Sequence, residues 1–382
     1  MALTLEWQNK DEGWFQEYEG ADPGYHTCTI DFLAKYMLKS RADALVAPLT
    51  KAVEFAWNFM HPDGSYGGEY GSRNTYHFYP HGFEVMARHT PKAGQIADAF
   101  LSAVGNGKRY INDDDRMTAH YVYNFLQAYD DYCPNRPRPI AEARTDQRTT
   151  WMPGAKMVVH RAAERSAGAG GAGYYAITNL SKGGCIKVFD NQGPIASDTG
   201  ITGKLADGQV VVSHLVQTDA SIKADPAKGR FEVETTLCKR RNNLPTPITN
   251  LIFRVLLLTI GRFNANLVRG LLQKILITGK PGTPYRVRRS IEFLSDRIVV
   301  EDRWPLETPF KRVAAGSDGT SIYVANSNVY QESVLCPWQE VDPSSLPVDG
   351  GMRVWRREYF RGSGHGPTQN DLATPGRGKP LD

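Results

Sequence analysis

Hydrophobic positions follow two different periods along the chain. Over residues 41–60 an apolar residue recurs at every third or fourth position, which predicts a helix with one apolar stripe. The stripe consists of Leu45, Leu49, Val53, Ala56, Trp57 and Met60. Ile96, Phe100 and Val104 repeat the pattern further on. After about residue 156, short runs rich in β-branched and aromatic residues alternate with Gly, Asn and Asp turns, which is typical of an antiparallel β-sandwich.

The helical part also contains a sequence repeat. The pairs Glu17-Tyr18 and Tyr25-His26 recur as Glu69-Tyr70 and Tyr76-His77, displaced by 52 and 51 residues, and a weaker third copy ends in His120-Tyr121. A fixed period of this size indicates a supersecondary unit that packs against its neighbours. Helical hairpins of this kind form an α/α toroid when they close a ring. About two and a half hairpins make only an arc, unless the chain begins partway through a longer protein.

We therefore expect an α+β multidomain protein. A partial α/α toroid of helical hairpins should cover 1–133, followed by a Pro-punctuated linker over 134–155. An antiparallel β-sandwich should cover 156–362, with a basic helical insertion at about 248–278. The last residues, 363–382, are rich in Gly and Pro and predict a disordered tail.

Charge is distributed unevenly along this sequence. The chain has a net charge of +4, yet the segment from Lys239 to Arg289 contains eleven Lys or Arg and no acidic residue, so the rest sums to −7. Within it an apolar helical stripe, 267–276, excludes Arg269 and Lys274. Three interpretations stay open: a helical insertion packed on the sandwich, a surface for an anionic polymer such as the acidic polysaccharide expected as partner, or a peripheral membrane contact through 251–276. Nucleic acid is not expected, because no binding module accompanies the charge.

The five cysteines are far apart and show no CxxC spacing, so we expect buried free thiols, no metal site and no cofactor. The first residues lack the basic and apolar regions of a signal peptide. As written, the chain is expected to be cytoplasmic, or periplasmic if an N-terminal part is missing.

The most informative stretch runs from Glu12-Gly13 through Glu17 to Tyr25-His26. It resembles the DG-x-x-x-E…YH motif of the heparinase II/III-like and alginate-type polysaccharide lyases, a family that joins an α/α toroid to an antiparallel β-sandwich. The resemblance implies cleavage of a uronic-acid-containing polysaccharide by β-elimination, with Tyr25 as general acid and in some members also as base. His26 is then a candidate for assisting the tyrosine.

The chemistry requires a group that neutralises the uronate carboxylate, because the proton on C5 is otherwise poorly acidic. Family members usually carry an Asn or His for this purpose well before the catalytic Tyr, whereas only 24 residues precede Tyr25 here. A His-rich segment early in the sandwich is also absent, since 166–174 contains no His. The second loop supplies substitutes. The candidate catalytic residues are Tyr25, His26, Asn74 and His77, and the candidate substrate-binding residues are Arg73, Tyr79, His81, His120 and Tyr121.

Two other functions remain open from the residues alone. The chain can be a non-catalytic glycan- or membrane-binding protein of exopolysaccharide assembly, with Tyr25 merely packed at a helix start. Asp113–Asp115 resembles the acidic cluster of toroidal terpenoid cyclases, but three Asp before a helix are also typical of a helix cap, and a cyclase does not explain the β-rich half.

Overall fold

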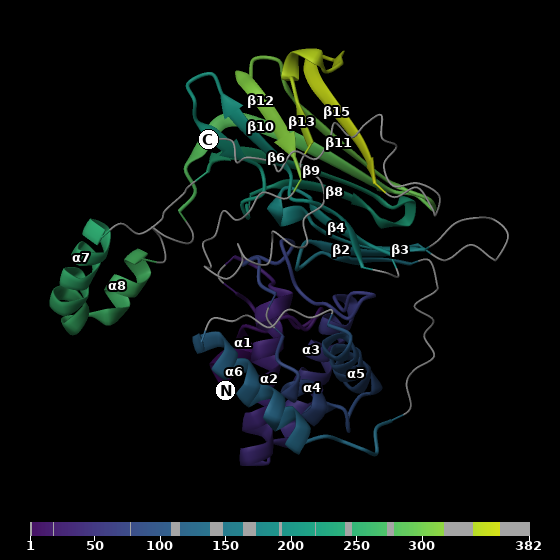
Figure 1. The fold of residues 1–382 in the computed structure, drawn as a ribbon, viewed down its shortest axis with the longest axis vertical. Helices are drawn as coiled ribbons and strands as arrows, with labels where there is room; N and C mark the ends of the chain where they lie inside the picture. The colour runs from purple at the N-terminus through teal and green to yellow at the C-terminus, as the bar shows by residue number, and fades with distance from the viewer. Residues whose placement is uncertain are drawn as a thin grey trace.

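The computed structural model describes residues 2–17, 19–76, 78–107, 115–137, 148–162, 173–190, 193–217, 219–240, 247–272, 279–316 and 339–359. It is a mixed helix-and-sheet structure in which the sheets are antiparallel. A helical layer, a smaller sheet and a larger curved sheet follow one another along the long axis of the molecule (Figure 1).

The helical layer is built from the first third of the chain. Its helices are α1 (Ala2–Glu6), α2 (Pro23–Ser40), η1 (Asp43–Leu45), α3 (Val46–Asn58), α4 (His81–Met86), α5 (Pro91–Gly105) and α6 (Asp115–Asp130). Helices α2, α4 and α6 contact one another in one row, while α3 and α5 form a second row against them. All six apolar residues of the predicted stripe in 41–60 are buried, as are Ile96 and Phe100, so the helical period identified core positions correctly.

The repeat predicted from the sequence is not a structural repeat at its Tyr-His pairs. Tyr25 and His26 lie in the first turn of α2, whereas Tyr76 lies in the loop before α4, which begins only at His81. The two tyrosines therefore occupy different environments. Asp22 caps α2 immediately before Pro23, and the second copy has no capping residue so close to its tyrosine.

The smaller sheet has the order β1-β2-β3-β4-β5 among the described residues. Its strands are β1 (Arg148–Met152), β2 (Met157–Ala162), β3 (Tyr174–Asn179), β4 (Cys185–Phe189) and β5 (Pro194–Asp198), with η2 (Leu180–Lys182) between β3 and β4. Both faces of β3 and β4 are buried. The smaller sheet has a core on each face, as the alternating side chains of β2 show. Met157 and Val159 belong to the core of the helical layer, and Val158 belongs to the core shared with the larger sheet.

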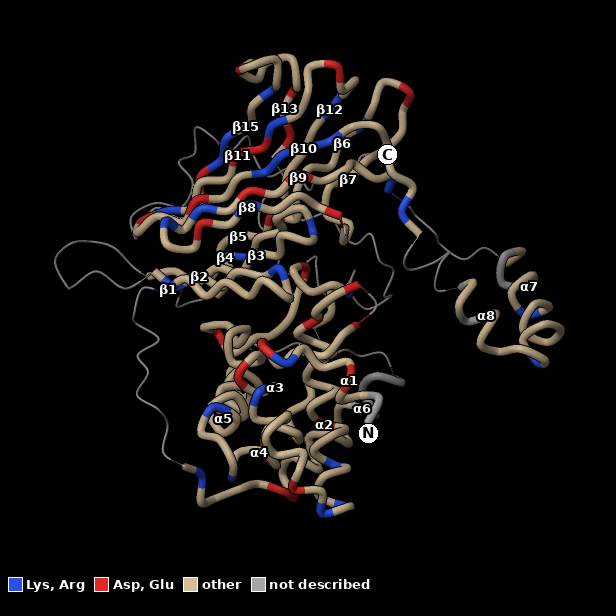
Figure 2. Tube along the Cα trace, turned by 180° about the vertical axis from the view of Figure 1, so that it is seen from behind, with Lys and Arg blue, Asp and Glu red and all other residues tan. Residues whose placement is uncertain are grey.

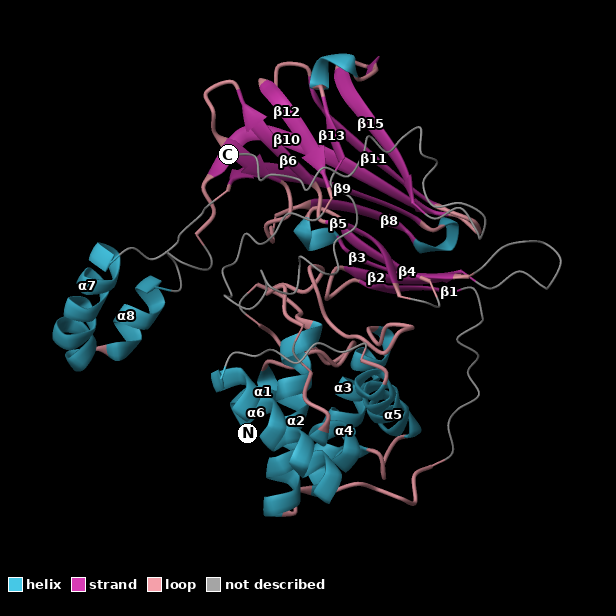
Figure 3. Ribbon diagram, viewed as in Figure 1, coloured by secondary structure: helices cyan, strands magenta, loops and turns pink. Residues whose placement is uncertain are grey.

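The larger sheet has the order β13-β12-β6-β7-β9-β10-β11-β15-β14, with β8 paired to β9. Its strands are β6 (Ile201–Leu205), β7 (Val210–Val212), β8 (Ser221–Asp225), β9 (Arg230–Lys239), β10 (Gly282–Phe293), β11 (Ile298–Pro305), β12 (Phe310–Ala315), β13 (Gln339–Val341), β14 (Val348–Asp349) and β15 (Met352–Tyr359). Short 3₁₀ turns, η3 (Pro226–Lys228) and η6 (Pro343–Ser345), join some of them. Figure 3 shows that helices and strands occupy separate parts of the molecule.

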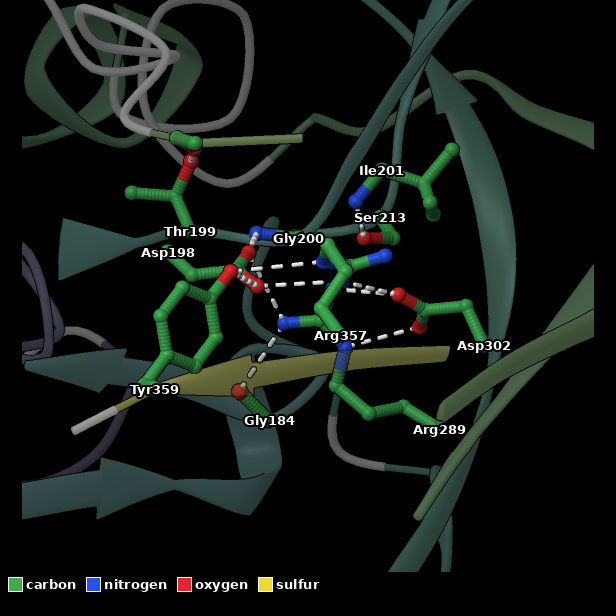
Figure 4. Close-up of polar contacts among 11 residues, drawn as sticks. Gly184, Asp198, Thr199, Gly200, Ile201, Ser213, Arg289, Asp302, Arg357 and Tyr359 are labelled. Carbon is green, nitrogen blue, oxygen red and sulfur yellow. Dashed lines mark hydrogen bonds and ion pairs between the residues drawn. The ribbon is translucent and has the colours of Figure 1, made fainter. Parts of the chain in front are cut away.

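A buried charge network lies where the chain passes from the smaller sheet to the larger one (Figure 4). Arg289 of β10 forms a bidentate pair with Asp302 of β11, both contacts being 2.7 Å, and its Nη1 lies 3.1 Å from Asp198 Oδ1 at the end of β5. Arg357 of β15 donates to Asp198 at 3.0 Å and to Asp302 at 2.5 Å, and the Tyr359 hydroxyl donates to Asp198 at 2.8 Å. Two positive and two negative charges therefore compensate one another in a buried site.

A helical hairpin interrupts the larger sheet between β9 and β10, where the sequence predicted a helical insertion at about 248–278. It consists of α7 (Pro247–Leu256), a π-helical turn η4 (Leu257–Gly261) and α8 (Ala265–Leu272). We name this segment, 247–272, the α7–α8 hairpin. It lies apart from the sheets and from the helical layer in both views, so it is not packed on the sheets (Figures 1 and 2).

One predicted boundary was wrong. The linker expected over 134–155 ends earlier, because Arg148–Met152 forms strand β1 and pairs antiparallel with β2. Pro153, interpreted as linker punctuation, instead occupies the turn between these strands. The predicted tail, 363–382, lies outside the described residues.

Candidate functional site

The first turn of α2 is fixed by one buried carboxylate. Asp22 accepts hydrogen bonds from the backbone N–H of Tyr25 at 2.9 Å, from the backbone N–H of Arg73 at 2.7 Å and from the Thr75 hydroxyl. The first bond caps the helix, and the others hold the loop that carries Arg73 against it. Gly71 permits this approach, since a Cβ there would lie 2.6 Å from Asp22 Oδ2.

Tyr25 and Arg73 consequently meet at the start of α2, and Glu17 is close enough for its charge to act on both. The Arg73 guanidinium lies over the Tyr25 ring, 5.3 Å from its centroid, and all three side chains are half-buried. We name these residues the α2 cluster.

Two acids of the α2 cluster have shifted pKa values. Burial and the charge of Asp22 raise the pKa of Glu17 to about 7, although Arg73 opposes the shift. Burial also raises the pKa of the Tyr25 phenol; Arg73 lowers it, and the charges of Asp22 and Glu17 raise it further. At neutral pH the tyrosine is therefore protonated, while Glu17 exchanges readily between its acid and base forms.

His26 points away from the α2 cluster. Its Nε2 lies 2.8 Å from the Ala52 carbonyl oxygen, and its ring packs between Phe15 and Phe55 with centroid distances of 5.7 and 5.1 Å. Burial lowers the pKa of this imidazole to about 4, so it is neutral at physiological pH. Consecutive helical residues diverge by about 100°, which is why a half-buried Tyr25 precedes a core histidine. This placement lends no support to a role for His26 beside the tyrosine.

Asn74 faces the smaller sheet. It is buried, adopts a left-handed backbone with φ 56°, and its Oδ1 accepts a hydrogen bond from Lys182 Nζ of η2. The same ammonium donates to the carbonyl oxygens of Glu69 and of Gly71, the latter at 2.9 Å. Asn74 therefore belongs to the contact between the helical layer and the smaller sheet.

A second lysine strengthens that contact. Lys187 of β4 lies 3.1 Å from Glu69 Oε2 and 3.1 Å from the Tyr76 hydroxyl, which itself donates to Glu69. All of these groups are buried or nearly so. Residues 69–76 are thus held by Asp22 on one side and by Lys182 and Lys187 on the other.

The remaining candidates lie in helix packing or outside the described part. Tyr79 and Tyr121 are buried, with ring centroids 5.7 Å apart. His81 is buried between Asp31 and Asp131, at 2.9 and 2.7 Å, and thereby connects α2, α4 and the end of α6. His77 lies outside the described residues, and of His120 only the helical backbone in α6 is described. The structure brings together Tyr25 and Arg73 from the predicted set, and Tyr79 lies close enough to Tyr25 for their charges to interact. The side chains of His26, Asn74, His81 and Tyr121 make other contacts.

Sequence reasoning missed the roles of Asp22, Lys182 and Lys187 and the raised pKa of Glu17. A signal existed for Asp22, because Asp before Pro at a helix start is a typical cap. Within the described residues, no group of three or more His, Cys, Asp or Glu is arranged to hold a metal ion. No protein-family model and no curated protein matches the sequence of this chain.

Proposed function

We propose that this chain is a polysaccharide lyase-like protein that cleaves a uronic-acid-containing polysaccharide by β-elimination. The helical layer then corresponds to an arc of an α/α toroid and the two sheets to a β-sandwich. The observation that carries the proposal is the α2 cluster: a phenol, a guanidinium and a carboxyl group of near-neutral pKa at one helix start.

Each group has a distinct part in the reaction. The Arg73 guanidinium pairs with the substrate carboxylate and makes the C5 proton more acidic. A base removes that proton, a double bond forms between C4 and C5, and the C4–O4 bond breaks. Tyr25, protonated at neutral pH, delivers its proton to the leaving O4 oxygen. Glu17 is the base that the structure supports best, because its charge is close enough to raise the pKa of Tyr25.

The decisive test is unsaturated uronate formation, followed by ultraviolet absorbance. The wild-type chain is incubated with polysaccharides that contain glucuronate, iduronate, mannuronate or guluronate. We expect absorbance to rise with one of them, and Tyr25→Phe to lower the rate by about 10²–10⁴-fold, the usual contribution of a positioned acid or base. Tyr36→Phe is the matched control, since Tyr36 lies exposed on the same helix.

The pH dependence tests Glu17. Because the base form is required, kcat/KM should rise as pH increases through about 7. Glu17→Gln should abolish this rise, and Arg73→Gln should lower kcat/KM by about 10- to 100-fold through loss of a charge-assisted contact. A flat absorbance trace with every polysaccharide contradicts the lyase proposal. If binding nevertheless persists and requires Arg73, the non-catalytic glycan-binding function takes its place.

A further inference from the structure

The α7–α8 hairpin exposes a large amount of apolar surface. Its exposed apolar side chains are those of Ile248, Leu251, Ile252, Phe253, Val255, Leu257, Leu258, Ile260, Phe263, Leu267 and Leu271. Phe263 is 88% exposed and Leu258 75%, whereas Val268 alone among the described side chains of the hairpin is buried. A helical hairpin in water is ordinarily stabilised by burying an apolar face, and this one buries almost none.

The exposed residues are ordered along α7 and the turn η4 that continues it. Ile248, Leu251, Ile252, Val255 and Leu258 follow the spacing of one face, and each is more than half exposed. Phe253, Leu257 and Ile260 follow the spacing of the opposite face and are less exposed. The hairpin therefore presents a continuous apolar strip outward.

The charge of the hairpin indicates which kind of surface can bind this apolar strip. Arg254 and Arg262 are exposed beside it, and no acidic residue occurs anywhere from 239 to 289. Figure 2 shows positive but no negative residues on the described part of the hairpin. An apolar strip bordered by arginines matches an anionic lipid surface, in which acyl chains lie beneath phosphate groups. The hairpin of a second copy carries the same arginines and no acidic residue, so it offers no complementary charge.

The length of the hairpin limits how deeply it can enter. Helix α7 and η4 together cover 247–261, shorter than the roughly 20 residues that cross a bilayer core. No helix in the part of the chain that the structure describes is long and apolar enough to pass through a membrane. We propose that the α7–α8 hairpin lies in the plane of an anionic membrane surface and attaches the chain to it peripherally.

Co-sedimentation of the full chain with vesicles tests this proposal. We expect binding to vesicles that contain phosphatidylglycerol and weaker binding to pure phosphatidylcholine. Replacing Arg254 and Arg262 by Gln should weaken binding to the anionic vesicles by about fivefold for each arginine. Leu258→Asn with Phe263→Asn should weaken it by at least about tenfold, and both changes are on exposed side chains that the fold does not use.

Matched controls keep the test specific. Leu101→Asn with Leu126→Asn removes two equally exposed leucines from α5 and α6, and should leave binding unchanged. The proposal is overturned if the wild-type chain does not bind anionic vesicles, or if both hairpin variants bind these vesicles as strongly as wild type. It is also overturned if the hairpin changes abolish a dimer in solution without affecting vesicle binding. The assay contains no polysaccharide, so its result is independent of the lyase proposal.

Discussion

Neutralising Asp198 is the sharpest test of how the two sheets are joined. In the Asp198→Asn variant the side chain keeps its shape but loses its charge. Arg289 and Arg357 then share the single carboxylate of Asp302, and one buried positive charge is left uncompensated. The backbone N–H of Gly200, which donates to Asp198 at 2.8 Å, keeps an acceptor only if the amide oxygen faces it.

Two arguments give the expected loss in the free energy of unfolding of Asp198→Asn. Although burial raises the pKa of Asp198, the charges of Arg289 and Arg357 and the hydrogen bond from Tyr359 lower it from 3.8 to about 2. This direction means that the fold favours the charged form of Asp198, by a few kcal/mol at most. Removing one member of a buried ion pair typically costs about 3–5 kcal/mol. We therefore expect a loss of about 3–5 kcal/mol in the free energy of unfolding.

Urea unfolding followed by tryptophan fluorescence measures this loss, because Trp304 and Trp355 lie buried in the same sheet. Asp349→Asn is the control: this exposed carboxylate pairs with Arg303, so its loss should cost less than about 1 kcal/mol. Adding Arg357→Met to Asp198→Asn restores neutrality and should recover part of the stability.

The pH dependence has a definite sign. A depressed carboxyl pKa gives stability that is complete above the unfolded pKa of about 3.9 and is lost as pH falls. The advantage of wild type over Asp198→Asn should therefore shrink between about pH 4 and pH 2. A variant within 1 kcal/mol of wild type at neutral pH would refute the view that this network is a strictly balanced set of charges.

Two further predictions concern the helical layer. Burial lowers the pKa of His81, but hydrogen bonds to Asp31 and Asp131 outweigh it and raise the pKa, so its stabilising effect is complete below about pH 6.5 and lost as pH rises through the raised value. The difference in melting temperature between wild type and His81→Asn should accordingly narrow as pH rises above about 6.5 and through the raised pKa; a difference that stays constant over this rise refutes the prediction. Lys182→Met leaves three buried acceptors of the 69–76 loop without a donor and should lower the free energy of unfolding in urea by about 3 kcal/mol. Lys228→Met, at an exposed lysine, is the control and should change it little. Equal effects of the two substitutions contradict the role of Lys182.

Much of the helical layer could be predicted from spacing alone. The apolar stripe of 41–60 became core because a helix buries one face, whatever its partners are. The same spacing rule also predicts that His26 is buried, because His26, Ile30, Leu33 and Met37 share one helical face. All four are buried. Extending the apolar pattern of Ile30, Leu33 and Met37 back to residue 26 assigns this histidine to the core.

The contacts between layers could not be predicted in this way. Lys182 and Lys187 occur in short strand and turn segments, where a lysine normally faces solvent. Their partners in the 69–76 loop are more than a hundred residues away in the sequence, and no local period connects them. The buried network around Asp198 is of the same kind, because its charges come from β5, β10, β11 and β15.

These long-range contacts bear directly on the candidate site. The 69–76 loop that places Arg73 over Tyr25 is fixed from two directions, by Asp22 of the helical layer and by the two lysines of the smaller sheet. We expect loss of either attachment to free the loop, and with it the guanidinium that the proposed lyase reaction uses. The sheets therefore contribute to the α2 cluster without supplying a residue to it. The helical layer and the smaller sheet are joined by these contacts, in which buried lysines of the sheet hold the loop that carries the half-buried Arg73.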